Sequence, residues 1–287
     1  MKPLFFLRCG FALLALASVT VFAQDQSAKR PARRPMPEPA NPALPSLILI
    51  GDSTVRNGQD DGQGKGAEGQ WGWGNPLAAH FDPAKLNVVN RAVGGLSSRT
   101  FLTGGHWERA LAFVKPGDVV IMQFGHNDSG ALNDASRARA SIKGTGEETA
   151  AIDNVLTKKH EVVHTYGWYL RKFIADTKAQ GATPIVCSLI PRKSWDAQGK
   201  ISRQTDTYAG WAAAVAKAEG VGFIDLHEMA AANYDALGRV AVMKLFPQVT
   251  PDEHTHPNLA GARLNAELVI VGLKRLPKNP LGPYFLR

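Results

Sequence analysis

Short apolar runs alternate with longer stretches of helical period along most of this chain. Such short runs, bounded by polar and turn-forming residues, indicate buried strands. The predicted strands are 47–50, 88–92, 119–123, 184–189 and 221–224, and the predicted helices are 106–114, 162–180, 205–219 and 258–273. Strands that alternate with helices predict an α/β fold, here a three-layer α/β/α sandwich with a central parallel sheet.

The N-terminal segment has a different pattern. Lys2 and Arg8 are followed by an apolar stretch that ends at Ala23, which is typical of a secretory signal peptide over residues 1–23. No later run is long and apolar enough to predict a transmembrane span. We therefore expect an exported protein, periplasmic or extracellular, whose mature chain begins near Gln24.

Composition divides the remaining chain into two parts. Residues 24–45 are rich in Pro, Ala and basic side chains and predict an extended, mobile tether. Residues 46–287 show no internal repeat and no second linker, so they are predicted to form one domain. The net charge is +8, but no dense basic cluster interleaved with aromatic residues occurs in the domain, which argues against nucleic-acid binding. A mildly positive domain suits an acidic polymer, or serves solubility alone.

Three predicted strands end in residues that suit acyl-transfer chemistry. Ser53 follows the first strand in Gly-Asp-Ser, although a serine there is by itself more often a turn or capping residue. Gly95 follows the second strand and can present a backbone N–H group, and Asn127 follows the third and offers a side-chain amide. In parallel sheets ligands bind outside the carboxyl ends of the strands. These residues therefore supply a nucleophile and donors for an oxyanion at one edge.

A histidine segment precedes the last predicted helix. His256 can exchange a proton near neutral pH, which a serine nucleophile requires, and either Asp252 or Glu253 can orient its ring. A metal site is the alternative for His254, His256, Asp252 and Asp128. Alternate residues of an extended segment face opposite sides, and no His-Glu-x-x-His helix occurs. We expect no metal and no other cofactor.

The Ser53, Gly95, Asn127 and His256 blocks occur in the order of the SGNH (GDSL-type) hydrolases, which the sequence resembles over about residues 46–275. Four segments look like those of rhamnogalacturonan acetylesterases: Gly51-Asp52-Ser53-Thr54, Gly72-Trp73-Gly74, residues 95–101 and residues 123–128. The resemblance implies a flavodoxin-like SGNH hydrolase fold. It also implies a secreted serine esterase that removes acetyl groups from a plant cell-wall polysaccharide, above all acetylated rhamnogalacturonan (pectin).

The resemblance further implies a role for each site residue. Ser53 is the nucleophile and His256 is its base, while the backbone N–H groups of Ser53 and Gly95 and the amide of Asn127 form the oxyanion hole. Members of the family usually carry an Asp three residues before the histidine, where this chain has Glu253. Glu253 is the predicted orienting carboxylate, and Asp252 is the alternative.

Two other functions are compatible with the same residues. One is a GDSL-type lipase or thioesterase acting on short acyl esters, although the hydrophilic, Gly-rich surroundings of Ser53 disfavour a long acyl groove. The other is a catalytically idle carbohydrate-binding protein, which the intact serine and histidine argue against. The connections 60–70 and 133–157 are unusually long and are expected to surround the active site or to form mobile loops.

Overall fold

A computed structural model describes Met1 and residues 36–56, 62–203, 207–248, 250 and 252–286. The predicted signal peptide, except Met1, and residues 24–35 of the predicted tether lie outside the described residues. Within the described ranges, no helix combines the length and apolar character needed to cross a bilayer.

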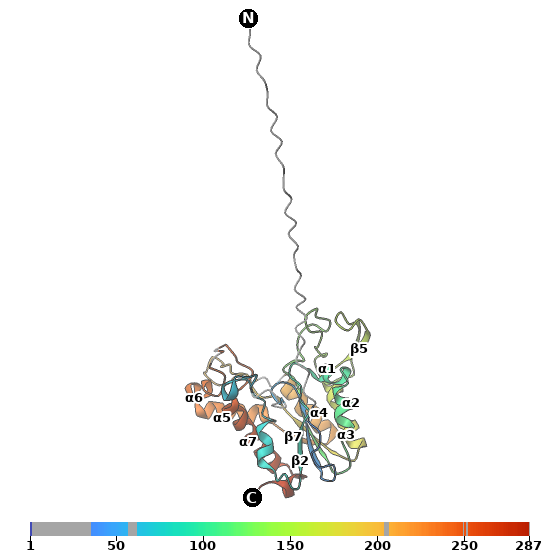
Figure 1. Ribbon diagram of the computed structural model, residues 1–287, viewed down its shortest axis with the longest axis vertical. Coiled ribbons are helices and arrows are strands. Elements are labelled where there is room, and N and C mark those ends of the chain that lie inside the picture. The colour runs from blue at the N-terminus through green and yellow to red at the C-terminus, as the bar shows by residue number, and fades with distance from the viewer. Residues whose placement is uncertain (2–35, 57–61, 204–206, 249, 251, 287) are drawn as a thin grey trace. The chain divides into compact units, whose positions relative to one another are not determined.

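The centre of the fold is a five-stranded parallel sheet (Figure 1). Its strands are β1 (Ser46–Gly51), β2 (Asn87–Asn90), β3 (Val119–Gln123), β6 (Thr183–Cys187) and β7 (Gly222–Ile224). Their order is β2-β1-β3-β6-β7, with every neighbouring pair parallel. This is the flavodoxin-like doubly wound order, in which β1 lies between β2 and β3 at the point where the strand order reverses. The predicted fold class is confirmed.

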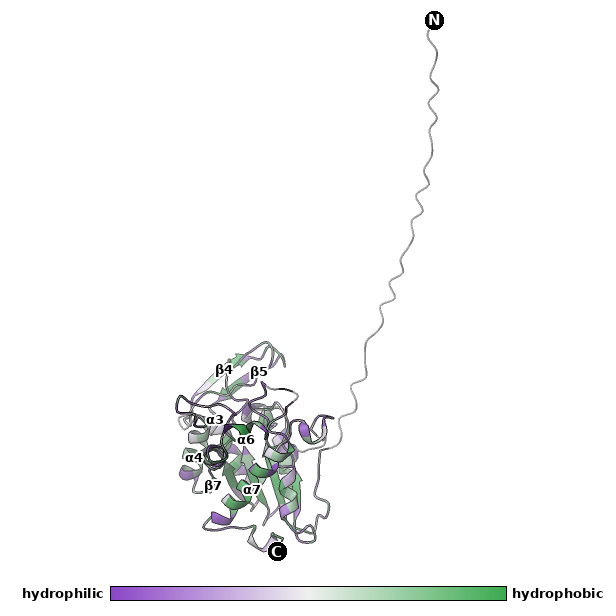
Figure 2. Cartoon of the chain, turned by 90° about the vertical axis from the view of Figure 1, so that its left-hand side faces the viewer, coloured by the Kyte–Doolittle hydropathy of each residue, from purple (hydrophilic) through white to green (hydrophobic). Residues whose placement is uncertain are grey.

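The alternation of side chains along β1 builds a core on each face of the sheet. Ile48 and Ile50 pack on one face with side chains of helices α1 to α4, whereas Leu47 and Leu49 pack on the other with α7. All four side chains are fully buried, and each contributes roughly 1.5–3 kcal/mol of transfer free energy. Figure 2 shows the resulting hydrophobic interior.

The helices are distributed over these two faces. On the first face lie α1 (Ser98–Thr103), α2 (His106–Leu111), α3 (Tyr166–Ala179) and α4 (Tyr208–Glu219). The other elements are α5 (Leu226–Leu237), α6 (Arg239–Met243), α7 (Leu259–Arg275) and the 3-10 turns η1 (Gly66–Glu68), η2 (Pro76–His80) and η3 (Gly282–Tyr284). Figure 1 shows α5 and α7 on the opposite side of the sheet from α2 and α3.

One predicted helix was wrong at its start. The helix expected over 162–180 begins only at Tyr166, because Val162 and Val163 belong to β5 (His160–His164), which pairs antiparallel with β4 (Thr149–Asp153). Thr165 is the helix cap, and its side chain accepts a hydrogen bond from the N–H of Trp168. The β-branched residues Val162 and Val163 therefore lie in a strand, and the helix begins only after the cap. The β4–β5 hairpin stands apart from the main sheet (Figure 2).

The last residues of the predicted tether, 36–45, lie against the folded unit. Arg91 donates from Nη1 to the carbonyl of Pro37 at 2.8 Å. Asn41 and Asn87 exchange two hydrogen bonds, at 3.0 and 2.9 Å between backbone and side chain. These contacts make the residues from 36 onward part of the compact unit that contains the sheet.

Candidate active site

The turn after β1 fixes Ser53 at the carboxyl edge of the sheet. Asp52 Oδ1 accepts hydrogen bonds from the backbone N–H and the hydroxyl of Thr54, both at 2.8 Å. A Cβ on Gly51 would lie 2.6 Å from the carbonyl oxygen of Gln123, so only glycine allows the neighbouring strand to approach. Ser53 itself is mostly buried, with 7% of its surface exposed.

The histidine segment reaches this serine from the far end of the chain. Ser53 Oγ lies 2.8 Å from His256 Nε2. Asn258 caps α7 two residues later by accepting a hydrogen bond from the N–H of Gly261, and the carbonyl of Pro257 accepts one from the N–H of Trp71. These contacts hold the segment over the end of β1.

Glu253 contacts His256 through both carboxylate oxygens. Oε2 lies 3.1 Å from His256 Nδ1, and Oε1 accepts the backbone N–H groups of Thr255 and His256 at 2.8 and 2.9 Å. Burial raises the pKa of this carboxyl, but the two N–H groups and the His256 side chain together hold that pKa below its ordinary value. Asp252, the alternative, is exposed, and its backbone carbonyl rather than its carboxylate contacts a ring, that of His254.

Gln70 contacts Glu253, which the sequence did not predict. Its Nε2 donates to Glu253 Oε2, the same oxygen that faces the His256 ring. Gln70 lies within the long polar connection 60–70, and nothing in that stretch distinguishes it from its neighbours. The length of this connection suggested either a segment around the active site or a mobile loop. The contact with Glu253 fits the first of these roles.

The glycine and asparagine blocks meet beside Ser53. Asn127 Nδ2 donates to the carbonyl of Leu96 at 2.9 Å, which joins the loops after β2 and β3. Gly95 has a φ of 82°, a left-handed conformation that favours glycine. A Cβ on Gly94 would lie 3.6 Å from Ser53 Cβ. Within the described residues, the N–H groups of Ser53 and Gly95 make no hydrogen bond.

Asp128 connects the asparagine block to α1. It is fully buried, and its Oδ1 accepts from the N–H and hydroxyl of Ser98 at 3.1 and 2.5 Å and from the hydroxyl of Ser141 at 3.2 Å. Burial raises the pKa of Asp128 to about 7, and the nearby Asp52 adds to that rise. The carboxyl therefore changes charge near neutral pH.

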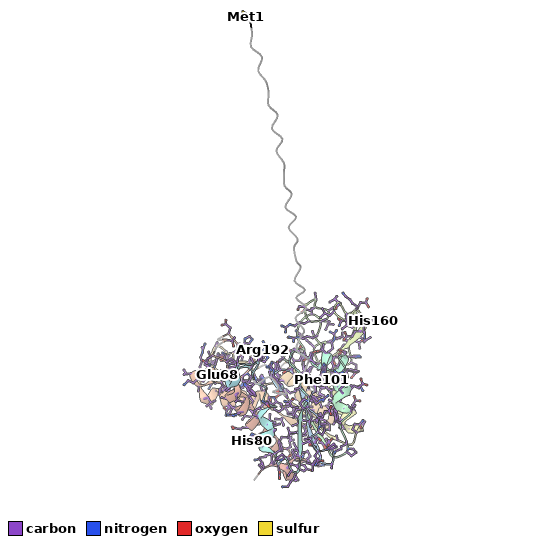
Figure 3. All side chains as sticks on the ribbon, viewed as in Figure 1. Met1, Glu68, His80, Phe101, His160 and Arg192 are labelled. Atoms are coloured by element: carbon purple, nitrogen blue, oxygen red, sulfur yellow. The ribbon has the colours of Figure 1, made fainter. Side chains whose placement is uncertain are left out.

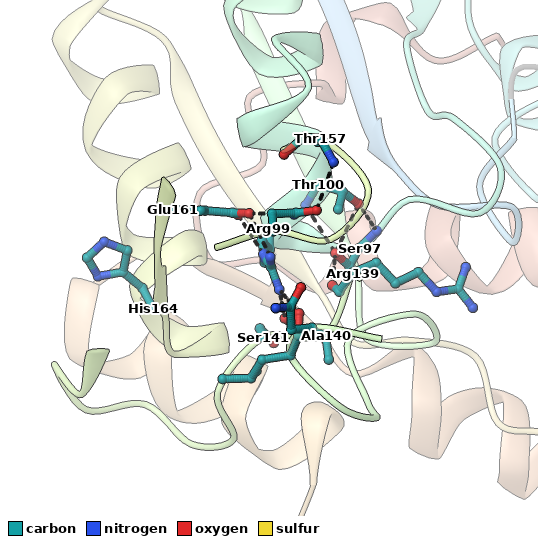
Figure 4. A network of polar contacts seen from close by, with 12 residues as sticks. Ser97, Arg99, Thr100, Arg139, Ala140, Ser141, Thr157, Glu161 and His164 are labelled. Carbon is teal, nitrogen blue, oxygen red and sulfur yellow. Dashed lines mark hydrogen bonds and ion pairs between the residues drawn. The ribbon is translucent and has the colours of Figure 1, made fainter. Parts of the chain in front are cut away.

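A buried arginine of α1 forms an ion pair with the β4–β5 hairpin (Figure 4). Arg99 is fully buried and pairs with Glu161 through Nε and Nη2 at 2.6 and 2.7 Å. Its Nη1 donates to the carbonyls of Leu132 and Ala140, and Ser97 donates to the carbonyl of Arg139. The network fixes residues 132–141 beside the glycine block.

Two other histidines, His126 and His254, lie near His256. His126 is buried, and burial first, then Arg192 and His256, lower its pKa to about 3, so it stays neutral. His254 Nε2 lies 3.2 Å from Arg192 Nη1. Among the described residues, no three His, Cys, Asp or Glu side chains are grouped as ligands of a metal ion.

Comparisons with known proteins identify the family of this chain and several relatives. Residues 49–264 match the GDSL-like Lipase/Acylhydrolase family. A rhamnogalacturonan acetylesterase of Emericella nidulans is 28% identical over 77% of this chain and 82% of its own length. The Bacillus subtilis protein YesY, named a probable rhamnogalacturonan acetylesterase, is 30% identical over 80% of this chain and 93% of its own length.

Solved structures show the same fold. The YXIM protein of Bacillus subtilis superposes with a TM-score of 0.62 at 25% identity, over 81% of this chain and 56% of that one. The acetylxylan esterase Axe2 of Geobacillus stearothermophilus superposes with a TM-score of 0.51 at 19% identity, over 79% of this chain and 93% of that one. The match over most of the domain shows that this chain belongs to the GDSL-like Lipase/Acylhydrolase family.

Proposed function

We propose that this protein is a serine esterase that removes acetyl groups from a carbohydrate. The observation that carries the proposal is the chain of contacts from Ser53 Oγ to His256 Nε2 at 2.8 Å and from His256 Nδ1 to Glu253 Oε2 at 3.1 Å. A serine becomes an effective nucleophile when a base and an orienting carboxylate are arranged in this way. The relatives named as acetylesterases support the choice of acyl group.

In the first half of the reaction, Ser53 Oγ attacks the acetyl carbonyl carbon while its proton passes to His256 Nε2. The carbonyl π electrons move to oxygen, and the oxyanion accepts hydrogen bonds from the N–H groups of Ser53 and Gly95 and from Asn127 Nδ2. The carbon–oxygen bond to the sugar then breaks. His256 returns its proton to the sugar oxygen, which leaves an acetyl group on Ser53.

In the second half, water replaces the sugar. His256 Nε2 takes a proton from the water, the hydroxide attacks the acetyl carbonyl, and the same donors hold the second oxyanion. The bond to Ser53 Oγ breaks, the serine recovers its proton from His256, and acetic acid leaves. Throughout, Glu253 accepts a hydrogen bond from Nδ1–H of His256. This hydrogen bond keeps Nε2 available as the base and stabilises the imidazolium.

The substrate that we propose is acetylated rhamnogalacturonan. Two relatives that align with about four-fifths of this chain carry that activity in their names. We further propose that residues 1–23 direct export and are removed, because a basic start followed by an apolar stretch is typical of signal peptides. An exported enzyme meets polysaccharide outside the cytoplasm.

Acetate release across a panel of esters tests the proposed function. The panel contains acetylated rhamnogalacturonan, acetylated homogalacturonan, acetylated xylan and 4-nitrophenyl esters of increasing chain length. We expect the highest kcat/KM with a polysaccharide acetate. Faster turnover of acyl chains longer than about four carbons would identify a lipase or thioesterase instead.

A further inference from the structure

Four hydrogen-bond donors meet the carboxylate of Glu253, and one of them comes from a distant part of the chain. Oε1 accepts the backbone N–H groups of Thr255 and His256, and Oε2 lies 3.1 Å from Nδ1 of the His256 ring. The fourth donor is Nε2 of Gln70, 183 residues away in sequence, which contacts Oε2. An ionised carboxylate has about four lone-pair sites, so Gln70 completes the set of donors that Glu253 can accept.

Gln70 differs from two other polar residues of its connection. Gln63 and Glu68 are exposed, and Figure 3 shows Glu68 at the surface of the molecule, whereas Gln70 is partly buried. The hydrogen bond that Gln70 donates is partly buried as well. A hydrogen bond from an amide to an ionised carboxylate is roughly twice as strong as one between neutral groups. The side chain of Gln70 is therefore used inside the site rather than in solvent.

The backbone at Gln70 is attached on both sides of the site. Its carbonyl accepts a hydrogen bond at 3.2 Å from Nη1 of Arg56, which lies just after the turn that holds the proposed nucleophile. The next residue, Trp71, donates its N–H at 2.9 Å to the carbonyl of Pro257, which follows the proposed base. The amide of Gln70 thus reaches the carboxylate from a backbone that is held beside both the nucleophile and the base.

The contact on Oε2 acts on the histidine as well as on the glutamate. The same oxygen faces His256 Nδ1, so a shift of Oε2 changes the hydrogen bond that orients the ring. A glutamate has one more rotatable bond than an aspartate and loses more rotamer freedom when it is fixed. Backbone N–H groups hold Oε1, and Gln70 holds Oε2, so the plane of the carboxylate is fixed. Proton transfer at Nε2 depends on the orientation of that ring.

We propose that Gln70 is a positioning residue of the active site, which holds Oε2 of Glu253 against the His256 ring. The inference rests on the proposed esterase function and adds a residue that acts on the base through Glu253. A purely structural Gln70 would affect the stability of its connection alone. A positioning residue affects the steps in which His256 takes and returns a proton, so kcat changes rather than KM.

The test begins with Gln70→Met, which removes the donor and keeps the length of the side chain. We expect kcat for a soluble acetate ester to fall roughly tenfold, with KM within about twofold of that of the unmodified enzyme. Gln70→Asn is the second variant and carries the test if Gln70→Met does not fold. It keeps an amide but places it one methylene short of Oε2, so a loss of kcat of similar size is expected. Gln63→Met is the matched control, the same substitution at an exposed position of the same connection, and should keep the kcat of the unmodified enzyme.

The proton NMR resonance of His256 Nδ1–H gives a second readout that needs no turnover. A ring N–H group that donates to a carboxylate resonates at low field, and Glu253→Gln identifies the signal by displacing it. We expect the signal to shift or broaden in Gln70→Met and to stay unchanged in Gln63→Met.

An unchanged resonance together with an unchanged kcat in both Gln70 variants would overturn the positioning role, even if Tm falls, and would leave the esterase function standing. If the unmodified protein releases acetate from no ester, the proposed function is wrong. The resonance alone then decides whether Gln70 orients the His256 ring.

Discussion

At the scale of single residues, we propose that Glu253 orients His256 in place of the aspartate that the family usually carries. Its extra methylene lets the carboxylate fold back on its own segment, so that Oε1 accepts the N–H groups of Thr255 and His256 while Oε2 faces the His256 ring. Gln70 also donates to Oε2. The carboxylate is therefore fixed by contacts on both oxygens.

Glu253→Gln should lower kcat by roughly a hundredfold or more with little change in KM, because an uncharged amide no longer stabilises the imidazolium that forms in the transition state. Steady-state kinetics with a soluble acetate ester measures this. Asp252→Asn is the control and should retain the activity of the unmodified enzyme. The reverse pattern, an active Glu253 variant and an inactive Asp252 variant, would assign the orienting role to Asp252.

Asp128 should make the stability of the fold depend on pH. Burial raises its pKa from 3.8 to about 7, so between these values the folded protein keeps a proton that the unfolded chain releases. The stabilisation is complete below about pH 4 and is lost as the pH rises through 7. In Asp128→Asn, the amide oxygen can still accept the hydrogen bonds from Ser98, but the side chain no longer titrates.

We therefore expect Tm to fall less between pH 5 and pH 9 in Asp128→Asn than in the unmodified protein. Asp134→Asn is the control, since Asp134 is solvent-accessible and hydrogen bonds from Ser136 lower its pKa. That variant should show the pH dependence of the unmodified protein over this range. Parallel Tm curves for Asp128→Asn and the unmodified protein would contradict the shifted titration.

At the scale of elements, the ion pair of Arg99 and Glu161 attaches the β4–β5 hairpin to α1. Arg99→Met leaves Glu161 without its charged partner in a mostly buried position, which typically costs about 3–5 kcal/mol. Urea unfolding should show this loss. Lys85→Met removes a cation from the exposed pair with Asp82 and should cost less than about 1 kcal/mol. Equal losses in the free energy of unfolding would show that the buried ion pair contributes no more than the exposed one.

The elements differ in how far the sequence predicts them. The strand over 119–123 and the helix over 258–273 are correct to within two residues, because a bounded apolar run and helical periodicity are local signals. The start of α3 and the β4–β5 hairpin were missed, because Val162 and Val163 fit a strand as well as a helix. Only pairing with a distant segment decides between the two, and that pairing is not a local property.

At the scale of the whole molecule, topology assembles the site. Parallel strands β1, β2 and β3 end at one edge, so the blocks after them meet there whatever their separation in sequence. The meeting of these blocks at one edge can therefore be predicted from the order of strands and motifs. The contact of Gln70 with Glu253 and the placement of Arg192 beside His254 depend on how long connections fold back, which no sequence pattern here encodes.

The measurement that tests the central claim most directly is acetate release by Ser53→Ala. Ser53 Oγ hydrogen-bonds to His256 alone among the described residues, so the variant should fold with an almost unchanged Tm. We predict that kcat falls by roughly a thousandfold or more, and that a serine-directed organophosphorus probe labels the unmodified protein at Ser53. Acetate release by folded Ser53→Ala at a rate close to that of the unmodified enzyme would contradict the proposed mechanism.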